Sequence, residues 1–365
     1  MTNAQQKQPK HVMMMAAGTG GHVFPALAVA KALQQQGNTV SWLATPTGME
    51  NRLLENHGIP IYQIDIQGVR GNGLIRKLVA PFKILKATLS AMRYMRQLKV
   101  DAVAGFGGYV AGPGGLAARL LGIPVIIHEQ NAIAGFTNTQ LSRVAKTVCQ
   151  AFPGTFVENT KIVTTGNPVR QEITAIVNPA LRYQEREKAG LPLRILIVGG
   201  SLGAQALNER VPAALQQLDV PLSVYHQSGQ KHAESTLARY DAKPETLQVE
   251  VQPFIEDMAQ AYTNADLVIC RAGALTVTEI ATAGVAAIFV PLPSAVDDHQ
   301  TANAKFLANH EAAQICPQAT LTSESLAQVL KPLMNREVLL NMAVKARQQA
   351  HPDATQHVVR LIQAL

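Results

Sequence analysis

Two stretches of the chain, far apart in sequence, share one order of features, and this repetition constrains the fold most. The segment "HVMMMAAGTGGHVFPALAVAKAL" (residues 11–33) runs from an apolar strand pattern through a glycine turn into an amphipathic helix pattern. The segment "LRILIVGGSLGAQALNERV" (residues 193–211) repeats that order. A strand, a glycine turn and a helix begin a βαβ unit, so each stretch is expected to open a doubly wound parallel sheet.

Short apolar strand patterns alternate with longer helix patterns through both halves. In the first half we predict strands at residues 11–17, 39–45, 100–108, 124–131, 145–152 and 161–168, with helices at residues 23–36, 49–57 and 113–121. In the second half we predict strands at residues 193–200, 222–227, 246–251, 266–273 and 285–293, and helical structure over residues 325–365. This alternation is typical of an α/β protein with helices on both faces of each sheet.

The length of 365 residues suits two domains better than one core. A charged stretch, "NPALRYQEREKAGLP" (residues 178–192), separates the two halves. We therefore expect an N-terminal domain over residues 1–168 and a C-terminal domain over residues 169–347. A last helix, at about residues 348–365, is expected to pack back on the first domain.

The composition narrows the partners of the chain. Hydrophobic residues make up 47% and charged residues 16%, as in a well-buried globular protein. The net charge of +7 favours anionic partners, while 5% aromatic residues and the lack of a nucleic-acid motif disfavour nucleic acid. The three cysteines form no CxxC pair, which fits a reducing cytoplasm, and no stretch reaches the roughly 18 apolar residues of a spanning helix. We expect a soluble or peripherally attached protein.

Four glycine-rich turns lie between a strand and a helix, where backbone N–H groups and the helix dipole attract phosphate. They read "AAGTGGH", "GFGGYVAGPGG", "GGSLGA" and "CRAGALTVTE". A dinucleotide dehydrogenase is disfavoured, because the strand after the first turn ends in "WLATPTG" without a ribose-binding acid, and Glu50 belongs to the next helix. The GxSxG match at residues 199–203 would make Ser201 a nucleophile with Asp266 and His310, but it explains only one turn.

The stretch from Ala265 to Pro293 is the most informative part of the second half. A strand there ends in Arg-Ala-Gly, and a helix is expected to begin near residues 274–276 and to carry Glu279. Thr276 and Glu279 could form a capping box. Alternatively, the helix start could receive a diphosphate while Glu279 accepts hydrogen bonds from ribose hydroxyls. Polar residues then cluster past the following strand, where open α/β sheets bind ligands: Asp297, Asp298, His299, Gln300 and Asn303.

Seven motifs carry a specific resemblance to a known family. They are "GTGGHVFPALAVA", "GFGGYVAGPGG", "HEQNAIAG", "TGNPVR", "GGSLGA", "RAGALTVTEI" and "DDHQTANA", in order from residue 18 to residue 304. With them the chain resembles the MurG family of bacterial N-acetylglucosaminyltransferases, within glycosyltransferase family 28. The resemblance implies a GT-B fold, with two Rossmann-like domains facing across a deep cleft. It also implies an inverting, metal-independent transfer of GlcNAc from UDP-GlcNAc to the C4 hydroxyl of the MurNAc-pentapeptide of lipid I, giving lipid II.

The resemblance further implies which residues form the site. UDP-GlcNAc would contact Thr19, Gly20, Gly21, Asn131, Arg170, Ser201, Ile255, Ala274, Leu275, Thr276, Val277, Thr278, Glu279 and Gln300. Uracil would meet the backbone near Ile255, ribose would meet Glu279, and the sugar would meet Gln300. The acceptor diphosphate would meet Gly18, Gly107, Gly108 and Tyr109. Neither a cofactor nor a metal is implied, and since no Asp-x-Asp triplet occurs, helix ends and Arg170 would meet the diphosphate charge.

An inverting displacement needs a base that takes the acceptor proton. His22 is expected at a helix N-terminus, where the dipole disfavours imidazolium and lowers the pKa, so it is the leading candidate. Glu129 in "HEQN" is the rival base and His128 a weaker one. A further interpretation is that His22 only caps or packs.

The segment at residues 73–99 mixes apolar residues with seven basic ones and contains no acid. Such a segment fits the interface of an anionic membrane, with Leu74, Ile75, Leu78, Val79 and Phe82 as the apolar contact. The alternative is an ordinary surface helix with a buried stripe. With a lipid acceptor, we expect a peripheral protein at the cytoplasmic face of the bacterial inner membrane, with cell-wall and division proteins as candidate partners.

Two other functions stay open. One is another GT-B UDP-sugar enzyme, such as a UDP-GlcNAc 2-epimerase, which the first-half turns and the basic apolar segment disfavour. The other is a non-catalytic GT-B membrane partner, which is disfavoured because both the turns and the donor residues are present.

Overall fold

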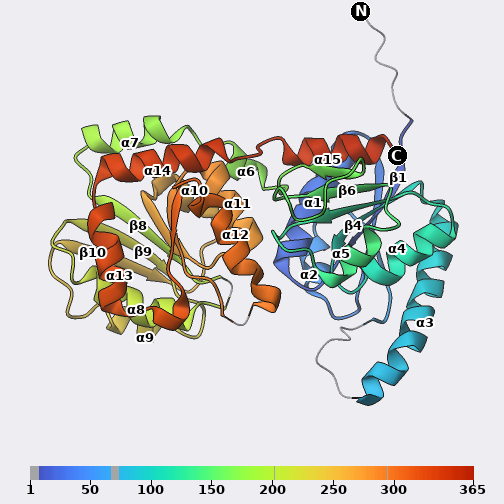
Figure 1. The fold of residues 1–365 in the computed structure, drawn as a ribbon, viewed down its shortest axis with the longest axis horizontal. Coiled ribbons are helices and arrows are strands. Elements are labelled where there is room, and N and C mark those ends of the chain that lie inside the picture. The colour runs from blue at the N-terminus through green and yellow to red at the C-terminus, as the bar shows by residue number, and fades with distance from the viewer. Residues whose placement is uncertain (1–7, 67–73, 201, 294) are drawn as a thin grey trace, which may run out of the picture. The chain divides into compact units, whose positions relative to one another are not determined.

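The computed structural model describes residues 8–66, 74–200, 202–293 and 295–365, without the side chains of residues 74–78 and 296. The chain forms two compact units (Figure 1). Unit 1 comprises Met1–Arg170 and Asp353–Leu365, and unit 2 comprises Gln171–Pro352. Each unit contains a parallel sheet with helices on both faces, so the predicted α/β class is confirmed.

Unit 1 is built on a seven-stranded sheet with the order β3-β2-β1-β4-β5-β6-β7, in which all neighbours are parallel. Its strands are β1 (His11–Ala16), β2 (Thr39–Ala44), β3 (Ile61–Gln63), β4 (Ala102–Gly107), β5 (Val125–Glu129), β6 (Thr147–Gln150) and β7 (Ile162–Thr164). The sequence pattern predicts six of these strands and does not predict the three-residue strand β3.

The helices of unit 1 are α1 (Gly20–Gln35), α2 (Met49–Leu54), α3 (Leu74–Leu98), α4 (Ala111–Leu120), α5 (Phe136–Leu141) and α15 (Ala354–Gln363). Helix α1 begins at Gly20, three residues before the predicted start, because Thr19 is extended and its carbonyl already accepts from the backbone N–H groups of His22 and Val23. His22 therefore lies in the first turn of α1.

Strand β1 is buried on both faces, which explains its unbroken apolar sequence. Val12 and Met14 belong to a core cluster with residues of α1 and α15. Met13 and Met15 point to the opposite cluster, which includes residues of α3 and α4. Two apolar layers thus clamp the centre of the sheet and hold the carboxyl ends of β1 and β4 in place.

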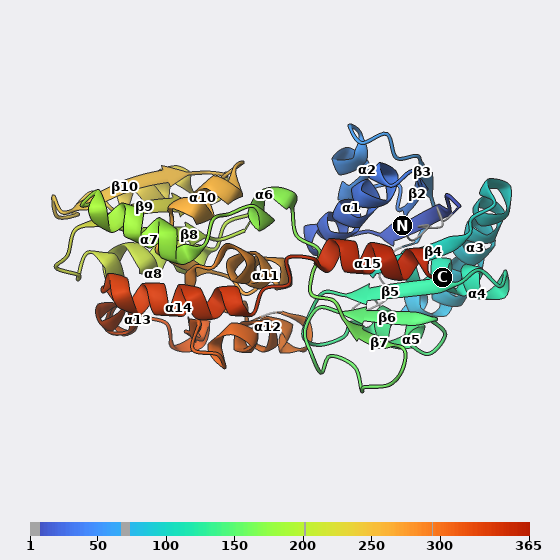
Figure 2. The ribbon, with the colours of Figure 1, turned by 90° about the horizontal axis from the view of Figure 1, so that it is seen from above.

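Helix α15 returns to unit 1 after the whole of unit 2 and lies along α1 (Figures 1 and 2). Val358, Val359 and Ile362 join the core cluster under α1. Two lysines hold the end of the chain: Lys10 Nζ donates to the Gln363 carbonyl at 3.1 Å, and Lys146 Nζ donates to the Leu365 carbonyl at 3.2 Å.

Unit 2 is built on a six-stranded parallel sheet with the order β10-β9-β8-β11-β12-β13. Its strands are β8 (Leu193–Val198), β9 (Leu222–Gln227), β10 (Leu247–Gln252), β11 (Leu267–Cys270), β12 (Ala286–Phe289) and β13 (Ala313–Ile315). Its helices are α6 (Gln171–Thr174), α7 (Pro179–Lys188), α8 (Gln205–Leu215), α9 (Ala233–Ala238), α10 (Met258–Asn264), α11 (Ala274–Ala283), α12 (His299–Ala308), α13 (Ser323–Leu330) and α14 (Arg336–Gln348).

The charged stretch at residues 178–192 is a packed helix rather than a spacer between the halves. Asn178 caps α7, its Oδ1 accepting from the N–H of Ala180 at 2.9 Å. One face of α7 is buried, and Arg186 forms a 2.8 Å ion pair with the buried Asp266. The sequence pattern does not predict this amphipathic helix, because its buried face includes arginines rather than only apolar residues.

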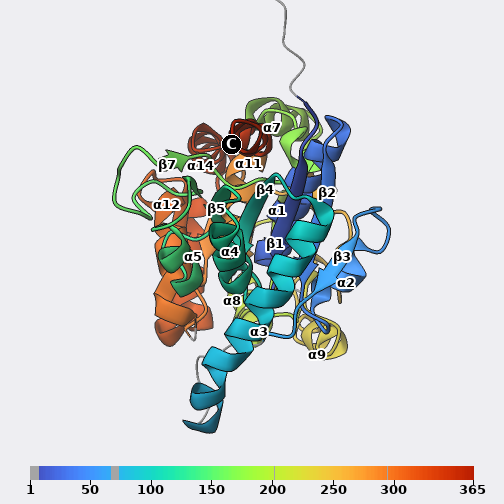
Figure 3. The same cartoon turned by 90° about the vertical axis from the view of Figure 1, so that its right-hand side faces the viewer.

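Helix α3 is the longest helix in the described parts of the chain, and its N-terminal part projects from the body of unit 1 (Figure 3). Its C-terminal part packs against α4 and the sheet through Ala87, Ala91 and Met95. Within the described residues, no helix combines the length and the apolar character needed to cross a membrane.

Candidate functional site

Two glycine turns of unit 1 lie in contact at the carboxyl ends of β1 and β4. Gly108 has φ of +80°, and a Cβ there would come within 2.2 Å of the Ala17 carbonyl oxygen. Gly107 has φ of +103°, and a Cβ there would meet Cδ2 of His22 at 2.9 Å. Only glycine therefore permits the two turns to meet and the imidazole to rest against the second one.

His22 is half-buried in the first turn of α1, where its Nδ1 lies 3.4 Å from Oγ1 of Thr19. The Thr19 side chain makes no capping bond to the helix. His22 thus lies at the positive end of the dipole of α1. The sequence placed His22 at a helix start, and the structure confirms this position.

An acid does stand beside the first glycine turn, although it comes from the next helix. The Glu50 carboxylate is 0% exposed and accepts from the N–H and hydroxyl of Thr45, each at 3.0 Å, and from the N–H of Gly18 at 3.4 Å. A Cβ at Gly48 would lie 2.0 Å from Glu50 Oε1, so the glycine makes room for this fold-back. Glu50 binds the protein's own backbone and holds the turn, which sequence reasoning missed.

Glu129 is a clamp for the loop that follows β5. Its side chain is 2% exposed. Oε1 accepts from the backbone N–H of Asn131 at 3.0 Å and from Asn131 Nδ2 at 3.3 Å. Oε2 accepts from the N–H of Gly135 at 3.1 Å and from Asn138 Nδ2 at 2.8 Å. Both oxygens are thus occupied by donors that shape the loop, which is a different task from proton abstraction.

His128 lies deeper and is held neutral. Burial lowers its pKa to about 4. Nε2–H donates to the Gly166 carbonyl at 2.9 Å, Nδ1 accepts from Gln130 Nε2 at 3.1 Å, and the ring stacks on Phe106. With both nitrogens engaged in the core, His128 supports the strand rather than facing a substrate.

The glycine turn after β8 is held by the side chain of Gln227, a residue that the sequence analysis did not predict to have a role. Gln227 Oε1 accepts from the N–H of Gly199 at 3.1 Å, and its Nε2 donates to the Gly200 carbonyl at 2.9 Å. Gly203 has φ of +78°, and a Cβ there would meet the Ser228 carbonyl oxygen at 1.9 Å. Ser201, a predicted donor contact, lies outside the described residues.

The hydrolase alternative fails on the position of its acid. Asp266 precedes β11, where it accepts from the backbone N–H of Arg194 at 2.8 Å and pairs with Arg186. Arg194 lies at the amino end of β8, whereas the GxSxG turn follows the carboxyl end of that strand. The acid and the proposed nucleophile therefore stand at opposite ends of the parallel sheet.

Helix α11 begins at Ala274, with Gly273 as its N-cap and without a side-chain cap. The capping box predicted as one alternative is therefore wrong, because Thr276 and Glu279 both lie inside the helix. Val277 and Thr278 are buried, at 0% and 6% exposed. The Thr278 hydroxyl donates to the Ala274 carbonyl at 2.8 Å, and the Val277 N–H donates to the Gly273 carbonyl. Of the predicted contacts here, Ala274, Leu275 and Thr276 are the first three residues of α11.

Glu279 lies in the second turn of α11, half-buried, and its Oε2 accepts from the phenol of Tyr262 at 3.2 Å. Gln300 supports the turn before α11, because its Oε1 accepts from the N–H of Leu292 at 2.9 Å and of Ala272 at 3.3 Å. Asn303 completes this support by donating from Nδ2 to the Ala272 carbonyl at 3.1 Å. Part of the predicted polar cluster thus fixes the loop at the carboxyl ends of β11 and β12.

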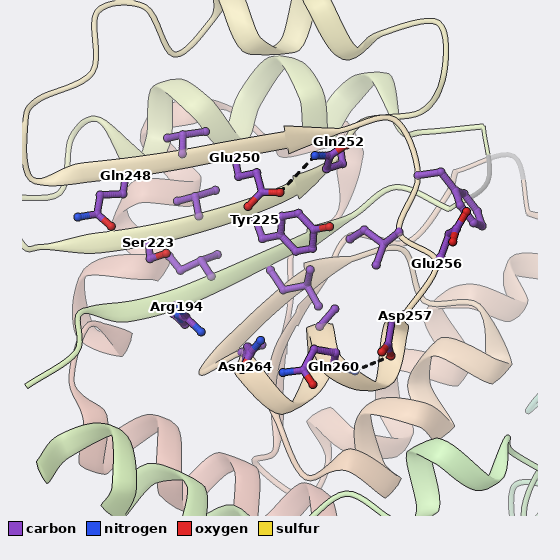
Figure 4. A pocket seen from close by; sticks show the side chains of 18 residues that line it. Arg194, Ser223, Tyr225, Gln248, Glu250, Gln252, Glu256, Asp257, Gln260 and Asn264 are labelled. Carbon is purple, nitrogen blue, oxygen red and sulfur yellow. Dashed lines mark hydrogen bonds between the residues drawn. The ribbon is translucent and has the colours of Figure 1, made fainter. Parts of the chain in front are cut away.

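A pocket of about 630 Å³ lies on unit 2 against β8, β9, β10 and α10 (Figure 4). Polar side chains line it, among them Tyr225, Glu250 and Asn264. Ile255 borders this pocket with a buried side chain, and none of the other predicted donor residues that the structure describes is part of its wall. The pocket is therefore a separate feature from the start of α11.

The remaining predicted donor and acceptor residues all lie in unit 1. Thr19, Gly20, Gly21, Asn131 and the acceptor set Gly18, Gly107, Gly108 and Tyr109 lie in unit 1, and Tyr109 is exposed. Arg170 is the last residue of unit 1 before α6. Among the residues that the structure describes, no three His, Cys, Asp or Glu side chains gather as a metal site would require.

The exposed apolar residues of α3 extend beyond the predicted set. Val79 and Phe82 are exposed, Phe82 at 74%, and so are Leu85 and Leu89 further along the helix. The side chains of the other predicted contacts, Leu74, Ile75 and Leu78, lie outside the description. A shallow groove of about 370 Å³ runs between Phe82, Leu85 and Leu89 and the basic Lys86 and Arg93.

Comparison with known proteins decides the family. Residues 12–150 match the glycosyltransferase family 28 N-terminal domain, and residues 194–358 match the glycosyltransferase family 28 C-terminal domain. The chain belongs to glycosyltransferase family 28. The two matched ranges contain all four glycine turns.

Members of family 28 with assigned names are similar over the full length. A protein of Acinetobacter baumannii (strain AYE) named "UDP-N-acetylglucosamine--N-acetylmuramyl-(pentapeptide) pyrophosphoryl-undecaprenol N-acetylglucosamine transferase" is 75% identical over 365 residues, covering 100% of both chains. A protein of the same name from Aeromonas hydrophila is 54% identical over 350 residues, which is 96% of this chain and 95% of that protein.

Solved structures agree with this family assignment. The crystal structure of Acinetobacter baumannii MurG is 73% identical, with a TM-score of 0.88 over 98% of this chain and 100% of that chain. The glycotransferase of kitacinnamycin is only 16% identical but has a TM-score of 0.67 over 97% of this chain and 100% of that chain. The latter likeness shows the fold alone, and together these structures confirm the predicted GT-B class.

Proposed function

We propose that the chain transfers GlcNAc from UDP-GlcNAc to the C4 hydroxyl of the MurNAc-pentapeptide of lipid I, which gives lipid II. The observation that carries this proposal is the full-length, 75% identity to a transferase whose name states this donor group and acceptor. The glycine turns, His22 and the polar support of α11 are the chemistry that such a transfer needs, so the site supports the same conclusion.

Unit 2 holds the donor in this proposal. The diphosphate meets the uncapped start of α11, where backbone N–H groups and the helix dipole stabilise negative charge. Uracil meets the backbone near Ile255, Glu279 accepts from the ribose hydroxyls, and Gln300 meets the sugar. Ser201, Leu275 and the unit 1 groups Thr19, Gly20, Gly21, Asn131 and Arg170 remain proposed donor contacts, whereas the buried Val277 and Thr278 are left out.

Unit 1 holds the acceptor and supplies the base. Its diphosphate meets Gly18, Gly107, Gly108 and Tyr109 at the paired turns. The imidazole of His22 takes the proton of the C4 hydroxyl as its oxygen forms a bond to the anomeric carbon of GlcNAc. The bond from that carbon to the diphosphate breaks with inversion, and UDP leaves with the electron pair. Helix ends and Arg170 stabilise the leaving group without a metal ion.

Glu129 has a structural task in this scheme. Its four hydrogen bonds from the loop fix Asn131 and the start of α5. Because a base must reach the substrate proton and change its charge, a buried carboxylate that is already fully used as an acceptor is a poor candidate. His22, half-buried beside the turns, is the better one.

The lipid nature of the acceptor suggests where the protein works. We assign the exposed apolar residues of α3, from Val79 to Leu89, to contact with an anionic membrane, because basic side chains flank them. We infer from this assignment that the protein works peripherally at the cytoplasmic face of the inner membrane. Cell-wall and division proteins are the partners expected there.

The decisive assay measures UDP release from UDP-GlcNAc with and without a soluble lipid I analogue, in the presence of EDTA. We expect release that depends on the acceptor and does not change with EDTA. Acceptor-independent release with formation of the 2-epimer would favour a UDP-GlcNAc 2-epimerase. Donor binding without turnover under either condition would favour a non-catalytic partner. Either result would overturn the proposal.

A further inference from the structure

The carboxylate of Glu279 is held by a side chain from a different helix. Tyr262 belongs to α10, is 1% exposed, and donates its phenol O–H to Glu279 Oε2 at 3.2 Å. Helices α10 and α11 pack against each other, so this bond spans their interface. The phenol lies in the core of unit 2, whereas Glu279 is half-buried.

The backbone of Tyr262 is fixed by the same guanidinium that fixes the end of α11. Arg182 Nη1 donates to the Tyr262 carbonyl at 3.0 Å. Its Nη2 donates to the carbonyls of Ala283 at 2.7 Å and Gly284 at 2.6 Å, which are the last carbonyls of α11. Arg182 is itself buried, and through these bonds it holds the C-terminal ends of α10 and α11 together. Tyr262 and Glu279 therefore face each other at a set register.

A glutamate has several rotatable bonds, and ordering such a side chain upon binding costs about 1 kcal/mol or more in rotamer entropy. The bond from the Tyr262 phenol reduces that freedom before a ligand arrives. A carboxylate can accept about four hydrogen bonds in all, so a bond from the phenol is compatible with bonds from a ligand. The arrangement is suited to a ligand with two neighbouring hydroxyls.

We propose that Tyr262 is a positioning residue that orients the Glu279 carboxylate for the vicinal hydroxyls of the donor ribose, and so selects ribonucleotides over deoxyribonucleotides. This inference rests on the proposed function, because that function makes Glu279 the ribose contact. Tyr262 itself is buried and does not touch the donor. Its effect reaches the substrate only through Glu279.

The test compares binding of UDP and 2′-deoxy-UDP by calorimetry, together with KM and kcat for UDP-GlcNAc. Tyr262→Phe removes only the hydroxyl, and we expect KM to rise and the preference for UDP to fall by about tenfold each, with kcat unchanged. Tyr240→Phe is the matched control, because Tyr240 is equally buried in unit 2 and its phenol bonds His226. This control should lose stability without changing the preference.

A double-mutant cycle separates positioning from a general loss of structure. In a Glu279→Gln background, Tyr262→Phe should have no further effect on the preference for UDP. An effect of the same size in that background would mean that Tyr262 acts through the fold, and would overturn this inference. If Tyr262→Phe keeps the preference for UDP while Glu279→Gln loses it, the positioning role of Tyr262 is refuted and the ribose contact of Glu279 stands. Unchanged selectivity in Glu279→Gln would instead remove the ribose contact from the proposed function.

Discussion

Replacing Glu129 by glutamine separates the two tasks that a glutamate at this position could have. Each carboxylate oxygen accepts one backbone N–H, from Asn131 and from Gly135, and one side-chain N–H. Side-chain amides can rotate, but backbone donors cannot. Whichever oxygen becomes an NH2 group, a buried backbone N–H then faces another donor.

The size of this effect follows from the bonds lost. A hydrogen bond to a charged group contributes about 1.5–3 kcal/mol, and a buried donor without a partner costs about 1–3 kcal/mol. We expect Glu129→Gln to lower the free energy of unfolding of unit 1 by about 3 kcal/mol, which is roughly a hundredfold in the unfolding equilibrium. The exposed Glu158 gives a matched control, since Glu158→Gln should change the same free energy by less than about 0.5 kcal/mol.

Trp42 makes the assay specific to one unit. It is the single tryptophan of the chain, lies in β2 of unit 1, and is 0% exposed. Its fluorescence during urea unfolding therefore reports unit 1 alone. If Glu129 has only this structural role, Glu129→Gln should unfold at a lower urea concentration than the wild type. It should also keep residual transferase activity with the pH dependence of the wild type. A variant as stable as the wild type but without turnover would refute the reasoning and return Glu129 to the position of base.

Three further predictions use the same protein. Gly108→Ala should destabilise unit 1 by roughly 3 kcal/mol in the Trp42 assay, because its Cβ meets the Ala17 carbonyl, whereas Gly122→Ala, with open space around it, should cost only about 1 kcal/mol. Burial lowers the pKa of His128 to about 4, so between pH 6.5 and 4 the unfolded chain binds more protons than the folded chain. The free energy of unfolding should therefore decrease by up to roughly 3 kcal/mol as the pH is lowered through this range, and a flat profile would contradict this. Phe82→Glu should weaken sedimentation with anionic vesicles at low salt by at least about tenfold, and an unchanged bound fraction would exclude this face of α3 as the membrane contact.

Most strands and most helices could be predicted because each depends on a local period, whereas the short strands β3 and β13 were not predicted. The run at β1 reads as a strand buried on both faces, and the glycine turns mark the strand-to-helix junctions. Helix α7 was missed because its buried face contains Arg182 and Arg186, whose side chains reach backbone carbonyls and Asp266 far away in sequence. A hydropathy pattern cannot show such partners.

The site was predictable only where glycine and helix starts determine it. His22 could be placed at a turn from its neighbours in sequence. In contrast, the fold-back of Glu50, the Gln227 support and the bond between Tyr262 and Glu279 join residues that only the packed fold brings together. Glu129 was predicted as the rival base, but the four donors that occupy its carboxylate have positions that the sequence does not specify.

The most direct test of the account asks whether loss of the base lowers turnover without weakening donor binding. Donor binding and turnover are measured side by side for the wild type, His22→Ala and the control His57→Ala. His57 follows α2, and the charge that acts on it is Lys31, which lies in the C-terminal part of α1. The account predicts that kcat of His22→Ala falls by about 10²–10⁴-fold, as for loss of a general base, while its Kd for UDP stays within about twofold and the control behaves as wild type. Near-normal turnover in His22→Ala would contradict the assignment of His22 as the base.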